Sequence, residues 1–138
     1  MTTRDKLNLY LQEMEASEFL WGKNDCLIYT NNAYHAMYGE GWADDWLGRY
    51  MVDGKRLLRV RELQKEYGFE SMEDGISSKL VRLNDISTYI PVGALVSSKG
   101  RKKHLSLGIY TGRHGAFLGN TGINYLPLDD IKDAWVRE

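Results

Sequence analysis

The order of apolar and polar positions divides the chain into a helical first part and a strand-rich second part. Through much of residues 3–80, apolar side chains recur every three or four positions, the spacing of a helix that buries one face. Residues 85–126 contain short runs of strand-forming residues bounded by turn residues. Helices followed by strands are typical of α+β folds, so we predict N-terminal helices packed on one side of a small antiparallel sheet.

The helical part contains four segments with this periodicity. Glycine follows two of them directly, at positions 39 and 68, and glycine commonly ends a helix. The last segment gives a weaker signal because Gly75 lies inside it. We therefore predict one helix that begins near Thr3, and three more at Cys26–Tyr38, 55–67 and 72–80.

The segment 41–46, which contains Trp42 and Trp46, follows the second predicted helix. Two roles are compatible with such a pair of tryptophans in a loop. They could form a lid over a groove beside Cys26, or they could anchor a neighbouring protein, as large aromatic residues do at interfaces. We favour contact with another protein.

The strand-rich part predicts four strands, of which the first two form a hairpin: 92–98, 104–111, 116–118 and 123–126. In the second strand, His104 and Ser106 point to the same face, since side chains alternate along a strand. After the last strand we predict a short helical tail that ends with Trp135.

Length and composition place the chain among ordinary globular proteins. Its 138 residues suffice for one domain, predicted at 1–138, and 43% of them are apolar and 27% charged. A net charge of −1 predicts no binding to nucleic acid or to an anionic membrane surface. No apolar run approaches the roughly 18 residues of a membrane span, so we predict no membrane insertion. The polar N-terminus predicts no signal peptide and therefore synthesis in the cytoplasm.

Cys26 is the only cysteine, so it cannot form a disulfide within the chain. It lies at the first turn of a predicted helix, where backbone N–H groups and the helix dipole favour a thiolate. The same N–H groups could form an oxyanion hole. Two interpretations stay open: Cys26 is a nucleophile, or it is a small buried apolar residue, as most cysteines outside disulfides are.

A cysteine nucleophile requires a base, and the chain has three histidines. His35 follows Cys26 by nine positions on the same predicted helix, which puts it on the opposite face. His114 lies in a predicted tight turn and is expected to be solvated. His104 is therefore the only candidate base, and we slightly favour the alternative in which it belongs to a solvated hairpin tip.

Three short motifs resemble those of NlpC-type peptidases, a family with a compact papain-like fold. Residues 21–26, Trp-Gly-Lys-Asn-Asp-Cys, resemble the family's Asp-Cys pair at the beginning of a helix. Residues 91–96 resemble its Pro-Gly-Asp strand opening, and residues 105–112 resemble its His-Val-Gly-Ile-Tyr-x-Gly strand. The resemblance implies an NlpC-type fold with N-terminal helices on a small antiparallel sheet.

The chain is still more similar to a branch of this family from phages and prophages, which ends with Pro-Leu and then Ala-Trp. Here these residues are 127–128 and 134–135, so the resemblance extends over residues 19–136. It implies a place in the virion tail after synthesis in the host cytoplasm. The implied partners are other phage tail proteins and, for an active enzyme, bacterial cell-wall peptides.

The resemblance implies that Cys26 is the catalytic nucleophile. We add His104 as the candidate base and Asn120 as the nearest polar candidate for the orienting residue, with Trp21, Asp25 and Ser106 beside the substrate. The chain departs from the family pattern at its most important point. When residues 108–110 are aligned on the family strand, Ser106 stands where the catalytic histidine belongs. Serine cannot act as a general base at neutral pH. Ala94 also replaces the aspartate of the strand opening.

Two hypotheses follow. In the first, which we favour, the chain is a degenerate member of the NlpC-type fold that serves as a structural or assembly protein of a phage tail. In the alternative, it is an active cell-wall peptidase or amidase, with Cys26 as nucleophile and His104 as base. No cluster of Cys, His and carboxylate residues has metal-ligand spacing, and we predict neither a metal nor a cofactor.

Overall fold

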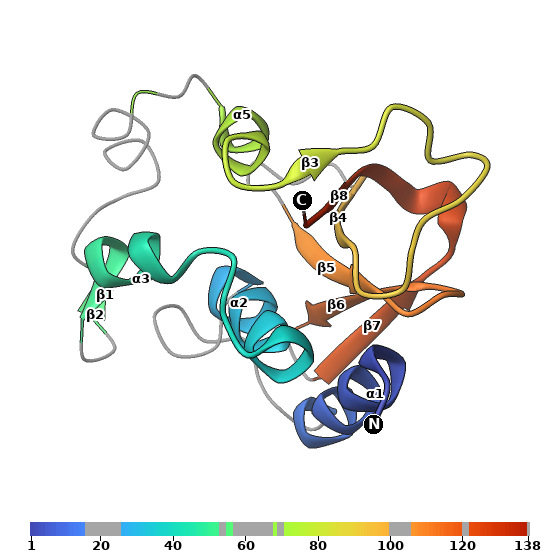
Figure 1. Cartoon of the computed structure of the whole chain (residues 1–138), viewed down its shortest axis with the longest axis horizontal. Coiled ribbons are helices and arrows are strands. Elements are labelled where there is room, and N and C mark those ends of the chain that lie inside the picture. Colours follow the sequence, from blue (N-terminus) through green and yellow to red (C-terminus); the bar gives the residue numbers. More distant parts are fainter. Residues whose placement is uncertain are drawn as a thin grey trace.

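The computed structural model shows helices packed against a curled antiparallel sheet of six strands (Figure 1). The predicted α+β class is therefore confirmed. The apolar residues that the described helices bury belong to one core on one face of the sheet. The structure describes residues 1–15, 26–52, 55–56, 68, 71–99, 106–119 and 122–137.

The described α-helices are α1 (Thr3–Met14), α2 (Cys26–Tyr38), α3 (Asp44–Tyr50) and α5 (Met72–Ser77). Helix α1 begins with a capping box, in which the Thr2 hydroxyl accepts from the Asp5 N–H and the Asp5 carboxylate accepts from the Thr2 N–H. Helix α2 has the predicted bounds and is followed by Gly39, whose φ of 82° suits a residue without Cβ. The helices predicted at the N-terminus, at 26–38 and near residue 72 are thus confirmed.

The six strands follow the order β3-β8-β4-β5-β6-β7 and every pair is antiparallel. Strands β4 and β5 form the predicted hairpin, with Leu95 opposite Ile109 and Ser97 opposite Leu107. The two shorter predicted strands are also present, as β6 and β7. The bounds are β3 Val81–Arg82, β4 Leu95–Ser98, β5 Leu107–Tyr110, β6 Gly115–Gly119, β7 Gly122–Leu126 and β8 Ile131–Val136.

The C-terminal residues form β8, so the prediction of a helical tail is wrong. Only the 3-10 turn η1 (Leu128–Asp130) is helical there. Strand β8 lies between β3 and β4, where it satisfies backbone groups of β4 that β5 leaves unpaired. The Trp135 side chain is fully buried, and its Nε1 donates to the Ser77 hydroxyl at 3.0 Å. This segment is a strand because it pairs with strands that are distant in the sequence. Local periodicity does not reveal such pairing.

The helix predicted at 55–67 does not begin at Lys55. Residues Lys55–Arg56 form strand β2, which pairs with β1 (Met51–Val52). The sequence between the two strands is Asp-Gly, a dipeptide that favours two-residue hairpin turns. The remainder of the predicted helix, 57–67, lies outside the described residues.

Trp42 and Trp46 belong to the core, so their predicted role as a lid or an anchor is wrong. Their side chains are 6% and 1% exposed, and the two rings meet edge to face with centroids 5.5 Å apart. The Trp42 Nε1 also donates to the hydroxyl of Thr30 on α2 at 3.1 Å. These residues fix the corner between α2 and α3, and little of either side chain is exposed.

Each face of the sheet contributes to a separate core. On the helical face, Leu107 and Ile109 pack with buried residues of α1 and α2. On the other face, Val96, Phe117 and Ile131 pack under a loop that includes Ile90. A hydrogen bond of 2.9 Å from the Tyr29 hydroxyl to the Ala116 carbonyl joins α2 to β6.

Candidate functional site

Cys26 is the first residue of α2, as the sequence predicts. Its side chain is partly buried and packs against the core on the helical face. Helix α2 lies against β5 and β6, so the thiol stands at the beginning of a helix that rests on an antiparallel sheet (Figure 1). The first N–H groups of a helix have no partners within it and favour an anion such as a thiolate.

The direction of α2 relative to β5 orients Cys26 on the sheet. At the C-terminal end of α2, Met37 and Tyr38 closely approach Gly93, where any Cβ would meet their side chains. The Gly93 N–H donates to the carbonyl of Tyr110, the last residue of β5. Helix and strand therefore end at the same side of the sheet. In Figure 1 they run in the same general direction, so Cys26 lies towards the end where β5 begins.

Two buried side chains hold the first turn of α2. The Thr30 hydroxyl donates to the Cys26 carbonyl at 2.8 Å and accepts from the Trp42 Nε1 at 3.1 Å. Thr30 is fully buried, and its two hydrogen bonds connect the α2–α3 corner to the backbone of Cys26. Thr30 is not predicted from the sequence, because a mid-helix threonine is usually neutral and gives no signal of a long-range partner, and Trp42 is predicted there only as a lid or an anchor.

Ser106 stands immediately before β5 and is partly buried. Its carbonyl accepts a hydrogen bond of 3.2 Å from the Ser98 N–H on β4. Leu107 and Ile109 face the helices, and strand alternation turns Ser106 to the other face with Gly108. A side chain at position 106 can therefore approach the beginning of α2 around the end of β5, and not from beneath the helix.

The structure describes two of the six site residues that the sequence analysis names, Cys26 and Ser106. The others lie outside the described residues: Trp21, Asp25, His104 and Asn120. Their roles remain predictions. Both described residues belong to elements that meet on the sheet, since α2 contacts β5 directly.

His35 is engaged at the end of α2 opposite to Cys26. Its Nε2 lies 2.7 Å from a carboxylate oxygen of Asp44, which also accepts from the Asn31 side chain at 2.8 Å. The Asn31 carbonyl oxygen in turn accepts from the Ala43 N–H at 2.7 Å. Hydrogen bonds from Asn31 and then His35 lower the pKa of Asp44. This network holds the corner between α2 and α3, and it explains why His35 does not serve Cys26.

His114 lies at the far end of β5 from Ser106, in the turn before β6. Its ring meets the Tyr125 ring edge to face, with centroids 6.4 Å apart. Because Cys26 lies towards the beginning of β5, His114 is not placed to act on it. Neither described histidine is therefore placed to act as the base for Cys26, and His104 remains the predicted base.

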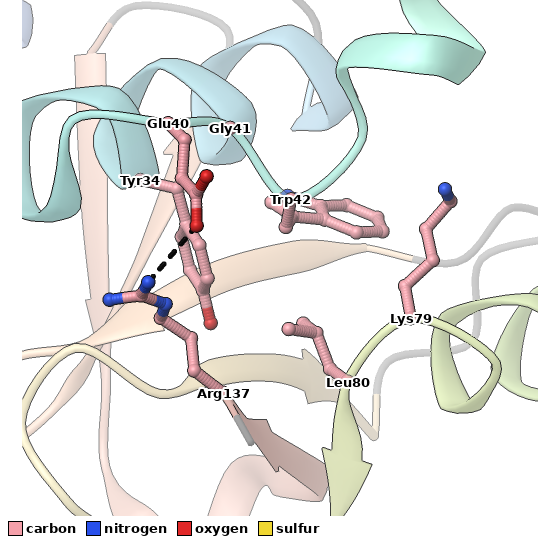
Figure 2. Close-up of a pocket in the computed structure, with 7 residues that line it drawn as sticks. All are labelled: Tyr34, Glu40, Gly41, Trp42, Lys79, Leu80 and Arg137. Carbon is pink, nitrogen blue, oxygen red and sulfur yellow. Dashed lines mark hydrogen bonds and ion pairs between the residues drawn. The ribbon is translucent and has the colours of Figure 1, made fainter.

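A pocket of about 250 Å3 opens beside the α2–α3 corner (Figure 2). Trp42 and Leu80 face each other across it, with Tyr34 behind. The Tyr34 side chain is 2% exposed, and burial raises its pKa most strongly. Its hydroxyl makes no hydrogen bond of normal geometry among the described residues, although the Leu95 N–H is near enough to lower the pKa somewhat.

The cations around this pocket are already neutralised. Arg137 pairs with Glu40 at 3.1 Å and stacks over the Tyr38 ring, with its guanidinium carbon 4.3 Å from the ring centroid. Lys79 pairs with Asp45 at 2.6 Å. Paired charges at a half-exposed rim stabilise the fold only modestly, and they offer little to an incoming ligand.

Within the part of the chain that the structure describes, no group of three or more Cys, His, Asp and Glu residues could hold a metal ion. None of the described helices combines the length and the apolar character needed to cross a bilayer.

A family model described as a domain of unknown function, DUF6950, matches residues 1–136. No curated protein matches the chain significantly, and no solved structure does. The family match covers both α2 and β5, and hence Cys26 and Ser106.

Proposed function

The chain belongs to the DUF6950 family, and we propose that it is a degenerate NlpC-type protein with a papain-like fold that serves as a structural or assembly component of a phage tail. The observation that carries this proposal is the position of Cys26 at the beginning of a helix that contacts β5, with Ser106 immediately before that strand. A cysteine begins a helix that rests on an antiparallel sheet, as a papain-like nucleophile does, and a serine precedes the strand where the base would stand.

The absence of a base at position 106 argues for a structural role. A positioned general base contributes about 10²–10⁴-fold to a rate, and a serine hydroxyl cannot supply this at neutral pH. The features that hold the nucleophile helix in place are nevertheless present. Thr30, Trp42 and Tyr29 connect α2 to its neighbours by buried hydrogen bonds. These bonds support the proposal of a fold that is retained without its catalytic base.

The assignment to a phage tail depends on the resemblance of the sequence to a branch found in phages and prophages. The fold gives one of that branch's motifs a structural reason. Ala134 and Trp135 lie in β8, in the interior of the sheet, and both are fully buried. The proposed partners are other tail proteins, and the proposed location is the virion.

An active cell-wall peptidase is the second candidate, with Cys26 as nucleophile, His104 as base and Asn120 as the orienting residue. The observation in its favour is the direction of α2. Cys26 lies towards the end of the sheet from which β4 leads to β5, and His104 belongs to that connection in the sequence. In this alternative Trp21, Asp25 and Ser106 lie beside the substrate.

Restoring a histidine at position 106 tests the NlpC-type part of the proposal. We expect Ser106→His to accelerate alkylation of Cys26 by iodoacetamide near pH 6 by about tenfold or more, since an imidazole beside a thiol favours the thiolate. Ser98→His is the matched control, because Ser98 lies on the neighbouring strand and bonds to the Ser106 backbone. Equal rates for the two variants would mean that position 106 is not equivalent to the family's histidine.

The tail assignment requires a separate experiment. Purified virions that encode the chain should contain it at a fixed stoichiometry, and crosslinking should join it to tail proteins. A stable monomer that is absent from virions would contradict the structural role, whatever the reactivity of Cys26.

A further inference from the structure

Four arginines have side chains that the structure describes, and they divide into two kinds. Arg82 pairs with Asp133, and Arg137 pairs with Glu40. Arg4 and Arg113 form no ion pair or hydrogen bond with a described residue. Both of these unpaired arginines line one groove, of about 620 Å3, which lies in the size range of small-ligand sites of about 300–1,000 Å3.

The residues that line the groove come from α1, from the turn between β5 and β6, and from β7. Arg4, Asn8, Gln12 and Glu15 occur at intervals of four, four and three residues, so they form one stripe along α1. All four side chains are exposed. Buried Leu11 forms part of the floor between them.

The two arginines lie at the same end of this stripe. An Nη atom of Arg4 is 3.0 Å from the position that a Cβ on Gly112 would take, so its guanidinium rests against the residue next to Arg113. Gly112 has a φ of 101°, which brings the backbone of the turn close to α1. The Arg4 guanidinium therefore lies against the turn that carries Arg113, and both arginines line the groove.

The opposite end of the stripe is acidic. The Glu15 carbonyl is 2.3 Å from the position of a Cβ on Gly122, which places the end of α1 at the beginning of β7. Burial raises the pKa of Tyr125 on β7 most strongly, and the nearby Glu15 charge raises it further. Glu15 is the only carboxylate that lines the groove among the described residues.

We propose that this groove binds a short extended peptide through its termini, with the carboxylate at Arg4 and Arg113 and the ammonium group at Glu15. The order of charges along the groove, cationic, then amide, then anionic, is complementary to such a peptide. The side-chain amides of Asn8 and Gln12 can each donate and accept, as the peptide's own N–H and C=O groups require. The Tyr125 ring, 48% exposed, provides an apolar surface beside them.

The length of the groove fixes the size of the ligand. From Arg4 to Glu15 the helix rises by about 16 Å, at about 1.5 Å per residue. An extended peptide rises by about 3.3 Å per residue, so about five residues span the same distance. The groove makes no use of Cys26 or Ser106, and its cationic end lies at the opposite end of β5 from them.

Penta-alanine with free termini is the probe, because the proposed contacts involve only backbone and termini. Titration calorimetry should detect binding to the wild-type chain. We expect amidation of the C-terminus to reduce the affinity of the peptide by at least about tenfold, since the amide loses a charge-assisted contact to the arginines. The double variant Arg4→Gln, Arg113→Gln should bind the free peptide no better than the wild type binds the amide.

The second arm concerns the amino end. Glu15→Gln should lower the affinity for the peptide with free termini. It should not change the affinity for a peptide with an acetylated N-terminus. Lys132→Gln, which removes an exposed cation on β8 outside the groove, should change neither affinity. Thermal unfolding of each variant verifies that the fold is intact.

Three results would overturn the proposal: no binding of penta-alanine at millimolar concentration, equal affinity for the free acid and the amide, or tighter binding of inorganic phosphate than of the peptide. The last result would identify a simple anion site. None of these outcomes depends on whether the chain is a degenerate peptidase.

Discussion

The two ends of helix α2 carry different chemistry. At its beginning, Cys26 is partly buried and stands at a helix N-terminus, where the helix dipole favours an anion. At its other end, His35 and Asn31 bond to one carboxylate oxygen of Asp44. The helix and its flanking corner thus contain a thiol, an imidazole, an amide and a carboxylate.

The two ends of α2 show that a helix can carry the residue types of a cysteine-peptidase site without placing them together as one site. His35 lies nine residues from Cys26, about 13 Å along the helix axis and on another face. Its hydrogen bonds serve the α2–α3 corner, where Asn31 is 2% exposed and must be satisfied. The end of α2 is therefore structural, whereas the beginning carries the cysteine of the proposed site.

Among the polar side chains of α2 and its corner, the largest expected effect is at the structural end. Asn31→Ala leaves the Ala43 N–H without its acceptor and removes a donor to Asp44, so the free energy of unfolding should fall by about 2–3 kcal/mol. Urea unfolding measures this loss. Asn32→Ala is the matched control, because Asn32 is exposed on the same helix and its loss should cost less than about 1 kcal/mol. Equal effects would contradict the structural role of the corner.

Thr30 connects the two ends and should have the next largest effect. Thr30→Val keeps the shape of the side chain but leaves the buried Trp42 Nε1 without an acceptor, which should cost about 1–2 kcal/mol. Thr30→Ser retains the hydroxyl and should recover part of the loss. If valine and serine have the same stability, the hydrogen bond to Trp42 does not hold the corner.

A smaller effect is expected from Asp44, and it depends on pH. The pKa of Asp44 is lowered in the folded state from its ordinary value of 3.8. The resulting stability is present above pH 3.8 and is lost as the pH falls further, through the folded-state pKa. Urea midpoints between pH 5 and pH 2 should therefore fall more steeply for the wild type than for Asp44→Asn. Parallel curves would refute this contribution.

The smallest effect on stability should come from Cys26 itself. Cys26→Ala removes a partly buried sulfur and should change the free energy of unfolding by about 1 kcal/mol or less. Leu27→Ala, one residue further along α2, removes a buried side chain and should cost about 2–5 kcal/mol. A large loss from Cys26→Ala would make the cysteine a core residue and weaken the interpretation of an inherited nucleophile.

The elements that the sequence predicts correctly are those with local signals. Helix α2 has apolar periodicity and a terminating Gly39, and the β4–β5 hairpin has strand-forming residues on both sides of a glycine-containing turn. Cys26 was placed at its helix start for the same reason. Short-range propensity and geometry are sufficient for features of this kind.

The features that the sequence does not predict depend on distant partners. Strand β8 forms because β4 offers a free edge about 35 residues earlier in the chain. Trp42 is buried because Thr30 accepts its N–H, and no local pattern reveals such a pair. The groove at α1 brings Arg4 and Arg113 to one turn from opposite ends of the sequence.

The reactivity of Cys26 tests the central claim most directly. We would measure its alkylation by iodoacetamide near pH 6 in the wild type, in His104→Gln and in a model thiol peptide. Without a base at position 106, the wild type should react within about tenfold of the peptide, and His104→Gln should leave its rate unchanged. A rate about 100-fold above that of the peptide, lost in His104→Gln, would contradict the account and establish Cys26 and His104 as a working pair.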